Sequence, residues 1–340
     1  MMVGVRLHAC ARRRLAAPLA LGAALAAGLA ELALSPALSL AQTAPAAACA
    51  VRRGAPPPVI DVHMHAVGTA PRGQPFANDT AALHAVIAEL DRQHVIAVFV
   101  STLMLPRTLQ WVQRDPRFIA TLAFRDTSMS VDTVRALVQR GTVHGLGELG
   151  FQYAGLRPDD PALDKYFSLA EELDVPVAIH TTGGGLPDVP AFRVRLGDPL
   201  MLEEVLVRHP RLRVNLMHAG LPFLESTLAT MRRYPQVYAD LSKINDSTAY
   251  PRAQFHDYLH ALLRADLGKR LMFGSDAAGP GAVSAGIEGI TSATFLTATQ
   301  RRDILCENAA RFYRLDARAK PPAKSAPPGP DHDNDADGHA

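Results

Sequence analysis

The sequence predicts an α/β fold, and within that class a (β/α)8 TIM barrel. Between residues 59 and 274, eight short aliphatic or β-branched runs alternate with segments whose apolar residues are spaced by three and four. The stretch that holds them, 58–315, has about the 250 residues of a typical barrel. Polar side chains gather where the strand runs end, as they do in barrel enzymes. A doubly wound open sheet is the alternative.

The expected elements follow one another in a regular order. The strands are expected at 59–65, 96–101, 118–124, 143–149, 175–181, 213–218, 237–241 and 271–274. The clearest helices between them are expected at 81–93, 131–140, 162–173, 202–209, 223–233 and 255–265. Because strands and helices alternate along the chain, the pattern indicates a parallel sheet with helices packed on its outside.

Both ends of the chain differ in composition from the barrel stretch. Residues 1–41 place arginines ahead of an Ala/Leu-rich stretch and end in small residues, which is typical of a secretory signal peptide. The apolar part contains Pro18 and stops at Glu31, short of the roughly 20 residues of a spanning helix. Residues 42–57 predict an Ala/Pro-rich tether, and residues 316–340 predict a disordered tail. We therefore expect a periplasmic or secreted protein with no stable membrane span.

The charge of the chain argues against a nucleic-acid partner. Removing residues 1–41 takes away four arginines and one glutamate, which changes the formal net charge from +2 to −1. The apparent basicity therefore belongs to the leader. We expect a small-molecule substrate, and nothing in the sequence indicates an oligomeric state.

Two cysteines remain beyond the leader, Cys49 in the expected tether and Cys306 in an expected helix. Two are too few for a disulfide framework, so a bridge between them is the less favoured interpretation. Cys49 follows three alanines, as in a lipoprotein attachment site. It lies well beyond the apolar part of the leader, however, and no large aliphatic residue precedes the alanines, so lipid attachment is also less favoured.

The pair His63 and His65 is the most informative local feature. Residues two apart on a strand point to the same side, so this segment offers two imidazole nitrogens to one metal ion. Four further candidate ligands end four other expected strands: Glu148, His180, His218 and Asp276. If the barrel closes, all six side chains point into the same open end of the barrel. Four imidazoles and two carboxylates suit zinc first, with manganese, iron or cobalt as alternatives.

At these residues the chain resembles the amidohydrolase superfamily, and more narrowly its amidohydrolase-related (amidohydrolase 2) metal-dependent hydrolases. The resemblance covers residues 59–315. It rests on four motifs: Asp-Val-His-Met-His at 61–65, Asp198-Pro199 with Arg-His-Pro at 208–210, Gly-Ser-Asp at 274–276, and the closing helix 304–312. Each motif is weak alone, and the combination is specific.

The resemblance implies a divalent metal, held by His63, His65 and Asp276, that activates a water molecule. Asp276 is then the general base, and His218 either binds a second metal or steers the water. Glu148 decides between one ion and two, because as a bridging carboxylate it allows a second ion with His180 and His218. No lysine stands at this point of the chain, so a carbamate bridge on this strand is excluded.

The leading hypothesis is an exported metal-dependent hydrolase of an ester, lactone, amide or related bond in a small molecule. The first alternative is a metal-dependent lyase that removes carboxylate from an aromatic acid without oxidation. Arg193, Arg195 and Lys243 are candidates to hold such a carboxylate, although solvated surface charge is the commoner role of such residues. The second alternative is an envelope binding protein that keeps the barrel and the metal but catalyses nothing.

Overall fold

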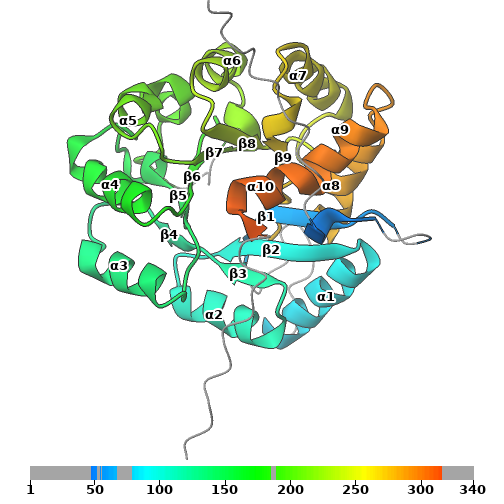
Figure 1. Cartoon of the computed structure of the whole chain (residues 1–340), viewed down its shortest axis with the longest axis horizontal. Coiled ribbons are helices and arrows are strands. Elements are labelled where there is room, and N and C mark those ends of the chain that lie inside the picture. The colour runs from blue at the N-terminus through cyan, green and yellow to red at the C-terminus, as the bar shows by residue number, and fades with distance from the viewer. Residues whose placement is uncertain (1–46, 52–53, 55, 67–78, 185–188, 316–340) are drawn as a thin grey trace, which may run out of the picture. The chain divides into compact units, whose positions relative to one another are not determined.

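In the described part of the chain, nine parallel strand segments make the wall of the barrel, and helices surround it (Figure 1). The structure is a computed structural model that describes residues 47–51, 54, 56–66, 79–184 and 189–315. The strands are β1 Val59–His65, β2 Val95–Ser101, β3 Phe118–Ala120, β4 Leu122–Phe124, β5 Leu146–Leu149, β6 Val177–His180, β7 Val214–Met217, β8 Val237–Asp240 and β9 Leu271–Met272. The predicted leader 1–41 and tail 316–340 lie outside the described residues.

Backbone hydrogen bonds join these segments into eight positions around a closed barrel. Within each sheet every neighbouring pair is parallel, in the orders β1-β2-β3 and β4 to β9. The amide of Thr121 donates to Val100 at 3.0 Å, and the amide of the next residue donates to Gly145 at 3.0 Å. β3 and β4 are therefore one barrel strand. The ring closes where the amide of Val62 donates to the carbonyl of Phe273 at 3.0 Å. The predicted TIM barrel is confirmed.

The eighth predicted strand is shorter than expected. Only Leu271 and Met272 belong to the ladder, because the amide of Phe273 donates to the carbonyl of Ile304 at 2.8 Å. The chain then follows β1 again, and the amide of His65 donates to Ala277 at 2.9 Å. This diversion brings the residues after β9 beside His63 and His65.

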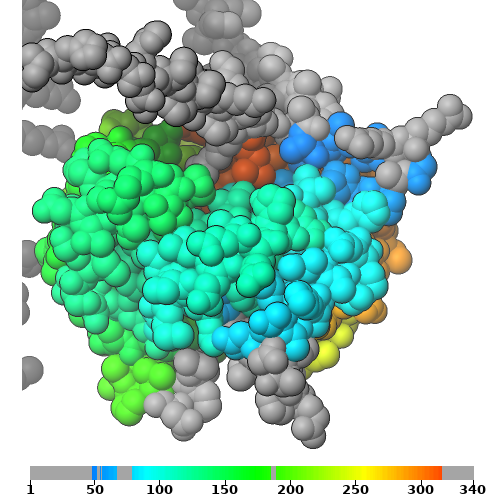
Figure 2. Space-filling view, turned by 90° about the horizontal axis from the view of Figure 1, so that it is seen from below, coloured from blue at the N-terminus to red at the C-terminus, as the bar shows by residue number. Residues whose placement is uncertain are grey.

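Helices cover the outside of the barrel, and Figure 2 shows the surface that the first of them form. They are α1 Asp79–Arg92, α2 Leu105–Arg114, α3 Val131–Gln139, α4 Asp164–Glu172, α5 Glu203–Arg208, α6 Leu224–Arg233, α7 Arg252–Arg264, α8 Gly281–Thr291, α9 Ala298–Arg302 and α10 Asn308–Tyr313. The six clearest predicted helices are all present. The sequence did not single out α2, whose first turn contains Pro106, or the glycine-rich α8. No helix in the described ranges is long and apolar enough to cross a membrane.

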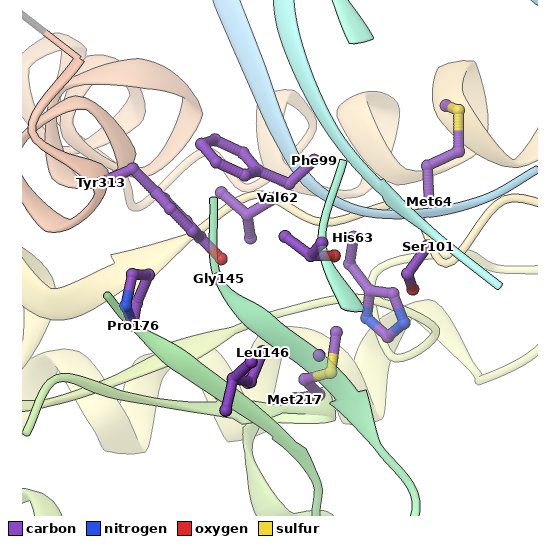
Figure 3. A pocket seen from close by; sticks show the side chains of 13 residues that line it. Val62, His63, Met64, Phe99, Ser101, Gly145, Leu146, Pro176, Met217 and Tyr313 are labelled. Atoms are coloured by element: carbon purple, nitrogen blue, oxygen red, sulfur yellow. The ribbon is translucent and has the colours of Figure 1, made fainter. Parts of the chain in front are cut away.

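The last helix, α10, covers the end of the barrel opposite the strand carboxyl ends (Figure 1). The ring of Tyr313 stacks on Phe99, with the centroids 3.5 Å apart. Figure 3 shows the barrel interior between Tyr313 at one end and His63 at the other. The void that remains there is about 10 Å³, no more than one water molecule needs. Because the interior is filled, chemistry is confined to the open end, where the strands finish.

A disulfide ties the start of the described chain to this end of the barrel. Cys49 lies in a short 3₁₀ helix, Ala47–Cys49, and is fully buried. It is bonded to Cys306, which is also fully buried, with an S–S distance of 2.06 Å. The disulfide between Cys49 and Cys306, which is the less favoured interpretation of the sequence, is therefore present. Cys49 lies within the segment 42–57 that is predicted to be a tether, and through this disulfide it anchors the chain to the barrel.

We expect loss of this disulfide to destabilise the barrel. It joins residues that lie 257 positions apart in the sequence, and removing a native disulfide typically costs about 2–5 kcal/mol in the free energy of unfolding. Denaturant unfolding of the Cys49→Ser/Cys306→Ser variant should show that loss. A reductant should lower the midpoint of the native protein and leave that of the variant unchanged. Equal midpoints without reductant would contradict the expectation.

Candidate metal centre

The six predicted ligands meet at the carboxyl end of the barrel strands. His63 and His65 lie on β1, Glu148 on β5 and His180 on β6. His218 directly follows β7, and Asp276 lies in the segment that returns to β1 after β9. A cavity of about 800 Å³ opens above them and is lined by His65, Glu148, His180, His218 and Asp276. His63 lies beneath them and is 1 % exposed, so it faces the other ligands and is shielded from solvent.

Glu148 stands between two pairs of histidines. Its Oε2 lies 3.7 Å from Nε2 of His63 and 3.3 Å from Nε2 of His65. Its Oε1 is hydrogen-bonded to Nδ1 of His180 and lies 3.7 Å from Nε2 of His218. Each carboxylate oxygen therefore faces a different pair. This is the arrangement that a carboxylate needs to bridge two metal ions.

Asp276 completes the half of the centre that β1 provides. Its Oδ1 lies 3.3 Å from Nε2 of His63 and 2.9 Å from Nε2 of His65. Its Oδ2 lies 3.1 Å from Nζ of Lys243, at the wall of the cavity. The backbone holds Asp276 in place, because its amide donates to the carbonyl of His63 at 2.7 Å. Gly274 permits this approach, since a Cβ there would lie 2.9 Å from Cβ of His63.

Ser242 orients one histidine from each half of the centre. Its hydroxyl is hydrogen-bonded to a carboxylate oxygen of Asp240. Nδ1 of His63 lies 2.9 Å from the same hydroxyl, and Nδ1 of His218 lies 3.0 Å from it. A serine hydroxyl has one hydrogen and two lone pairs, and an ionised carboxylate can only accept. The hydroxyl therefore donates to Asp240 and accepts from both imidazoles, which leaves Nε2 of each ring free to bind a metal.

The other two histidines are also held through the nitrogen that points away from the centre. Nδ1 of His65 lies 3.3 Å from the carbonyl oxygen of Ser101. Nε2 of His180 lies 3.1 Å from the carbonyl oxygen of Gly184. Such outer hydrogen bonds fix the tautomer of a metal-binding histidine. All four rings are thus set with one nitrogen toward the centre.

The donor set and its burial fit a divalent metal ion. Nε2 of His63 is buried and has no hydrogen-bond partner among the described residues. Among the residues that the structure describes, ring nitrogens and carboxylate oxygens form two groups compact enough for an ion. These groups share one member and consist of His63, His65 and Asp276, and of His63, Glu148 and His218. A metal would satisfy the orphaned nitrogen and neutralise the crowded carboxylates.

Without a metal, the centre is a cluster of opposite charges. Burial lowers the pKa of His65, but hydrogen bonds to Asp276 and Glu148 outweigh it and raise that pKa to about 9. For His63, burial is likewise outweighed by the charges of Asp276 and Asp240, and its pKa rises well above the usual value. Burial raises the pKa of Glu148 and of Asp276, yet the neighbouring histidines hold both well below their usual range. Metal binding must therefore displace protons from the imidazoles.

Metal affinity should accordingly rise with pH. Below the raised pKa of about 9 for His65, each proton that the metal displaces changes the affinity about tenfold per pH unit. Lowering the pH from 8 to 6 should weaken binding steeply. Titration calorimetry in two buffers of different ionisation enthalpy counts the protons released. The variant His65→Gln should release fewer protons, and release of none by the native protein would contradict the expected charge state.

Sequence reasoning missed several residues of the site. Asp240 lies in the predicted strand 237–241 and Ser242 directly follows it, but they were not recognised because their contacts are made only in the folded barrel. Asp61, part of the quoted motif, accepts hydrogen bonds from the amides of His63 at 3.1 Å and Ser275 at 3.0 Å, and burial raises its pKa to about 6. Of the three cations considered for a substrate carboxylate, Lys243 lines the cavity, whereas Arg193 and Arg195 do not.

Comparison with known proteins identifies the family of this chain. The family model described as "Amidohydrolase" matches residues 60–315, which is most of the chain. The chain belongs to the amidohydrolase family. Enzymes of this family are metal-dependent, and the centre of this amidohydrolase has residues that could hold a metal. The search of curated proteins found no match.

Solved structures share the barrel with this amidohydrolase at low sequence identity. A probable 2-pyrone-4,6-dicarboxylic acid hydrolase from Acinetobacter baumannii is 15% identical with a TM-score of 0.57, covering 75% of this chain and 99% of that one. A 2,6-dihydroxybenzoate decarboxylase from Rhizobium is 17% identical with a TM-score of 0.53, covering 76% and 99%. An amidohydrolase from Burkholderia multivorans with bound zinc is 20% identical with a TM-score of 0.55, covering 76% and 99%. These likenesses show the fold.

Proposed function

We propose that this amidohydrolase is a divalent-metal-dependent hydrolase of an ester, lactone, amide or related bond in a small molecule. The observation that carries the proposal is the position of Glu148, with one carboxylate oxygen toward each pair of histidines, directly below the cavity. We further propose two ions, with zinc as the first candidate, because imidazole and carboxylate donors suit it.

The ligands divide into two sets around Glu148. His63, His65 and Asp276 would hold one ion, and His180 and His218 the other. When bound, such ions lower the pKa of water and polarise the oxygen of a scissile carbonyl. In the alternative with a single ion, His218 is free to steer the attacking water.

Asp276 is positioned to take the proton from the attacking water. Its carboxylate reaches the floor of the cavity, and the ammonium of Lys243 contacts the oxygen that faces away from His65. In the metal-free centre the charged histidines depress the pKa of Asp276, which weakens it as a base. The imidazoles must be neutral when they bind a metal, so in the loaded enzyme the charge of the ion would replace theirs beside this carboxylate.

The test is the metal content of the native protein and of Glu148→Gln, together with hydrolysis of a panel of small esters, lactones and amides. We expect about two ions per chain in the native protein and about one in the variant, because a neutral amide is a poor bridge. One ion in the native protein would overturn the binuclear centre. Tight ligand binding with no turnover of any panel member would favour a binding protein over a hydrolase.

A metal-dependent lyase is the second candidate function. Its support is the presence of Arg107, Arg125 and Lys243 in the lining of the cavity, since positive charge suits an aromatic acid. A structural neighbour, 5-carboxyvanillate decarboxylase from Sphingomonas paucimobilis, is 14% identical with a TM-score of 0.53. Release of carbon dioxide from aromatic acids, with no hydrolysis of the panel, would favour this function.

We also propose that the protein acts outside the cytoplasm, in the periplasm or as a secreted protein. The leader pattern in residues 1–41 supports this, and so does the Cys49–Cys306 disulfide, because disulfides persist mainly in oxidising compartments. A disulfide-bonded Cys49 offers no thiol for lipid attachment. Cell fractionation and the mass of the mature protein test the proposal. A full-length chain in the cytoplasm would refute it.

A further inference from the structure

One cation in the cavity has no acidic partner among the described residues. Arg125 directly follows β4 and lines the cavity with the metal ligands. Of the other two cations in the lining, Arg107 is paired with Asp79 and Lys243 with Asp276. Within the described ranges, no carboxylate forms an ion pair with Arg125, so its charge is available to a ligand.

An aromatic side chain holds the guanidinium in place. Its central carbon lies over the ring of Tyr153, 4.4 Å from the centroid. Tyr153 in turn packs on His180, with the ring centroids 4.8 Å apart. Tyr153 therefore connects the guanidinium to the metal centre. One face of the guanidinium is covered, and the N–H groups along its edge remain suited to a planar, bidentate acceptor.

The charge of the cavity favours an anion at this position. Glu148 and Asp276 are the only carboxylates in the described lining, and both belong to the metal centre. A divalent cation there would neutralise them and leave the positive charge of Arg125 exposed to the cavity. A cavity lined by one sign of charge concentrates ligands of the opposite sign.

We infer that Arg125 is the specificity-determining residue of this site and that it binds a carboxylate group of the substrate, beside the bond that the metal centre attacks. The inference rests on the proposed metal-dependent function and adds the substrate class. A carboxylate matches the planar fork of one guanidinium, and because a phosphate can also bind such a fork, the experiment compares the two. The rest of the substrate faces a wall that includes Leu103, Met104, Ile244 and Tyr250, so it is largely apolar.

Binding of three simple probes to the metal-loaded full chain tests the inference: benzoate, its neutral analogue benzamide, and phenyl phosphate. Titration calorimetry measures each affinity without any turnover. We expect benzoate to bind at least about tenfold more tightly than benzamide, because a charge-assisted bidentate pair is worth that much or more. Arg125→Gln should abolish this preference by weakening benzoate alone. Arg125→Lys keeps the charge but loses the planar fork, so its preference for benzoate over benzamide should be intermediate between those of the native protein and Arg125→Gln.

Arg195→Gln is the matched control, since Arg195 is exposed and does not line the cavity. It should leave all three affinities unchanged. The inference is overturned if benzoate shows no saturable binding, if Arg125→Gln binds benzoate as tightly as the native protein, or if phenyl phosphate binds more tightly than benzoate. If Arg125→Gln still binds benzoate but no longer does so once the metal is removed by a chelator, the carboxylate is bound by the metal and not by Arg125. Failure of the proposed function appears separately, as missing metal or missing turnover.

Discussion

Replacing Asp276 by Asn should reduce kcat by about 10³-fold or more while the barrel stays folded. An amide cannot accept the proton of the attacking water, and general base catalysis is commonly worth about 10²- to 10⁴-fold. Asn keeps the shape of the side chain, and the hydrogen bond that the backbone amide of residue 276 donates to the carbonyl of His63 does not involve the carboxylate. Steady-state kinetics should be combined with circular dichroism and with metal analysis of the same sample.

The control for this substitution is Asp257→Asn, an exposed position on α7 outside the cavity lining. It makes the same chemical change and should leave kcat unaltered. Because Asp276 also contacts the two β1 histidines, the variant should be saturated with metal before it is assayed. Turnover within a few fold of the native rate in a metal-saturated variant would refute the role of Asp276 as the base.

Ser242→Ala should weaken metal binding by about 10- to 100-fold, the usual effect of losing an outer hydrogen bond to a ligand. The substitution removes the shared acceptor of His63 and His218, so both rings lose the hydroxyl contact of their Nδ1 atoms, and His218 keeps only the backbone carbonyl of residue 242, at 3.4 Å. Competition with a chromophoric chelator measures the affinity. Because one hydroxyl serves histidines in both halves of the centre, we expect both ions to bind more weakly.

Two further variants separate this effect from a general loss of stability. Ser242→Thr keeps a hydroxyl and should recover part of the affinity. Ser168→Ala, at an exposed position on α4, should have no effect. If Ser242→Ala lowers the unfolding midpoint of the metal-free protein but leaves the chelator competition unchanged, Ser242 supports the fold and does not position the ligands.

The barrel could be predicted because its signals are local. The hydrophobic run 59–65 coincides with β1, and the other strands lie inside the predicted ranges except β2, which begins one residue earlier at Val95. The places where prediction and structure differ depend on distant partners. The run 118–124 is interrupted at Thr121, where the hydrogen bonds pass from β2 to β5. The run 271–274 is cut short because the carbonyl of Ile304 takes the amide of Phe273.

The candidate ligands could be predicted for a related reason. In a parallel barrel every strand ends on the same face, so polar residues that end separate strands are brought together by the fold class alone. Arg125 also follows a strand, but a lone arginine in a sequence gives no sign of whether it has a partner. Only the folded chain shows that Arg107 and Lys243 form ion pairs and that, among the described residues, no carboxylate forms one with Arg125.

The sequence by itself determined the fold class, the six candidate ligands and the family. The spacing of apolar residues and the polar residues that end each strand are both visible in short stretches of consecutive residues. Only the tertiary structure decided how those ligands are oriented. It placed one oxygen of Glu148 toward each histidine pair, joined His63 and His218 through Ser242, and paired Cys49 with Cys306. These contacts join residues that lie far apart in the chain, so their geometry exists only once the barrel has closed.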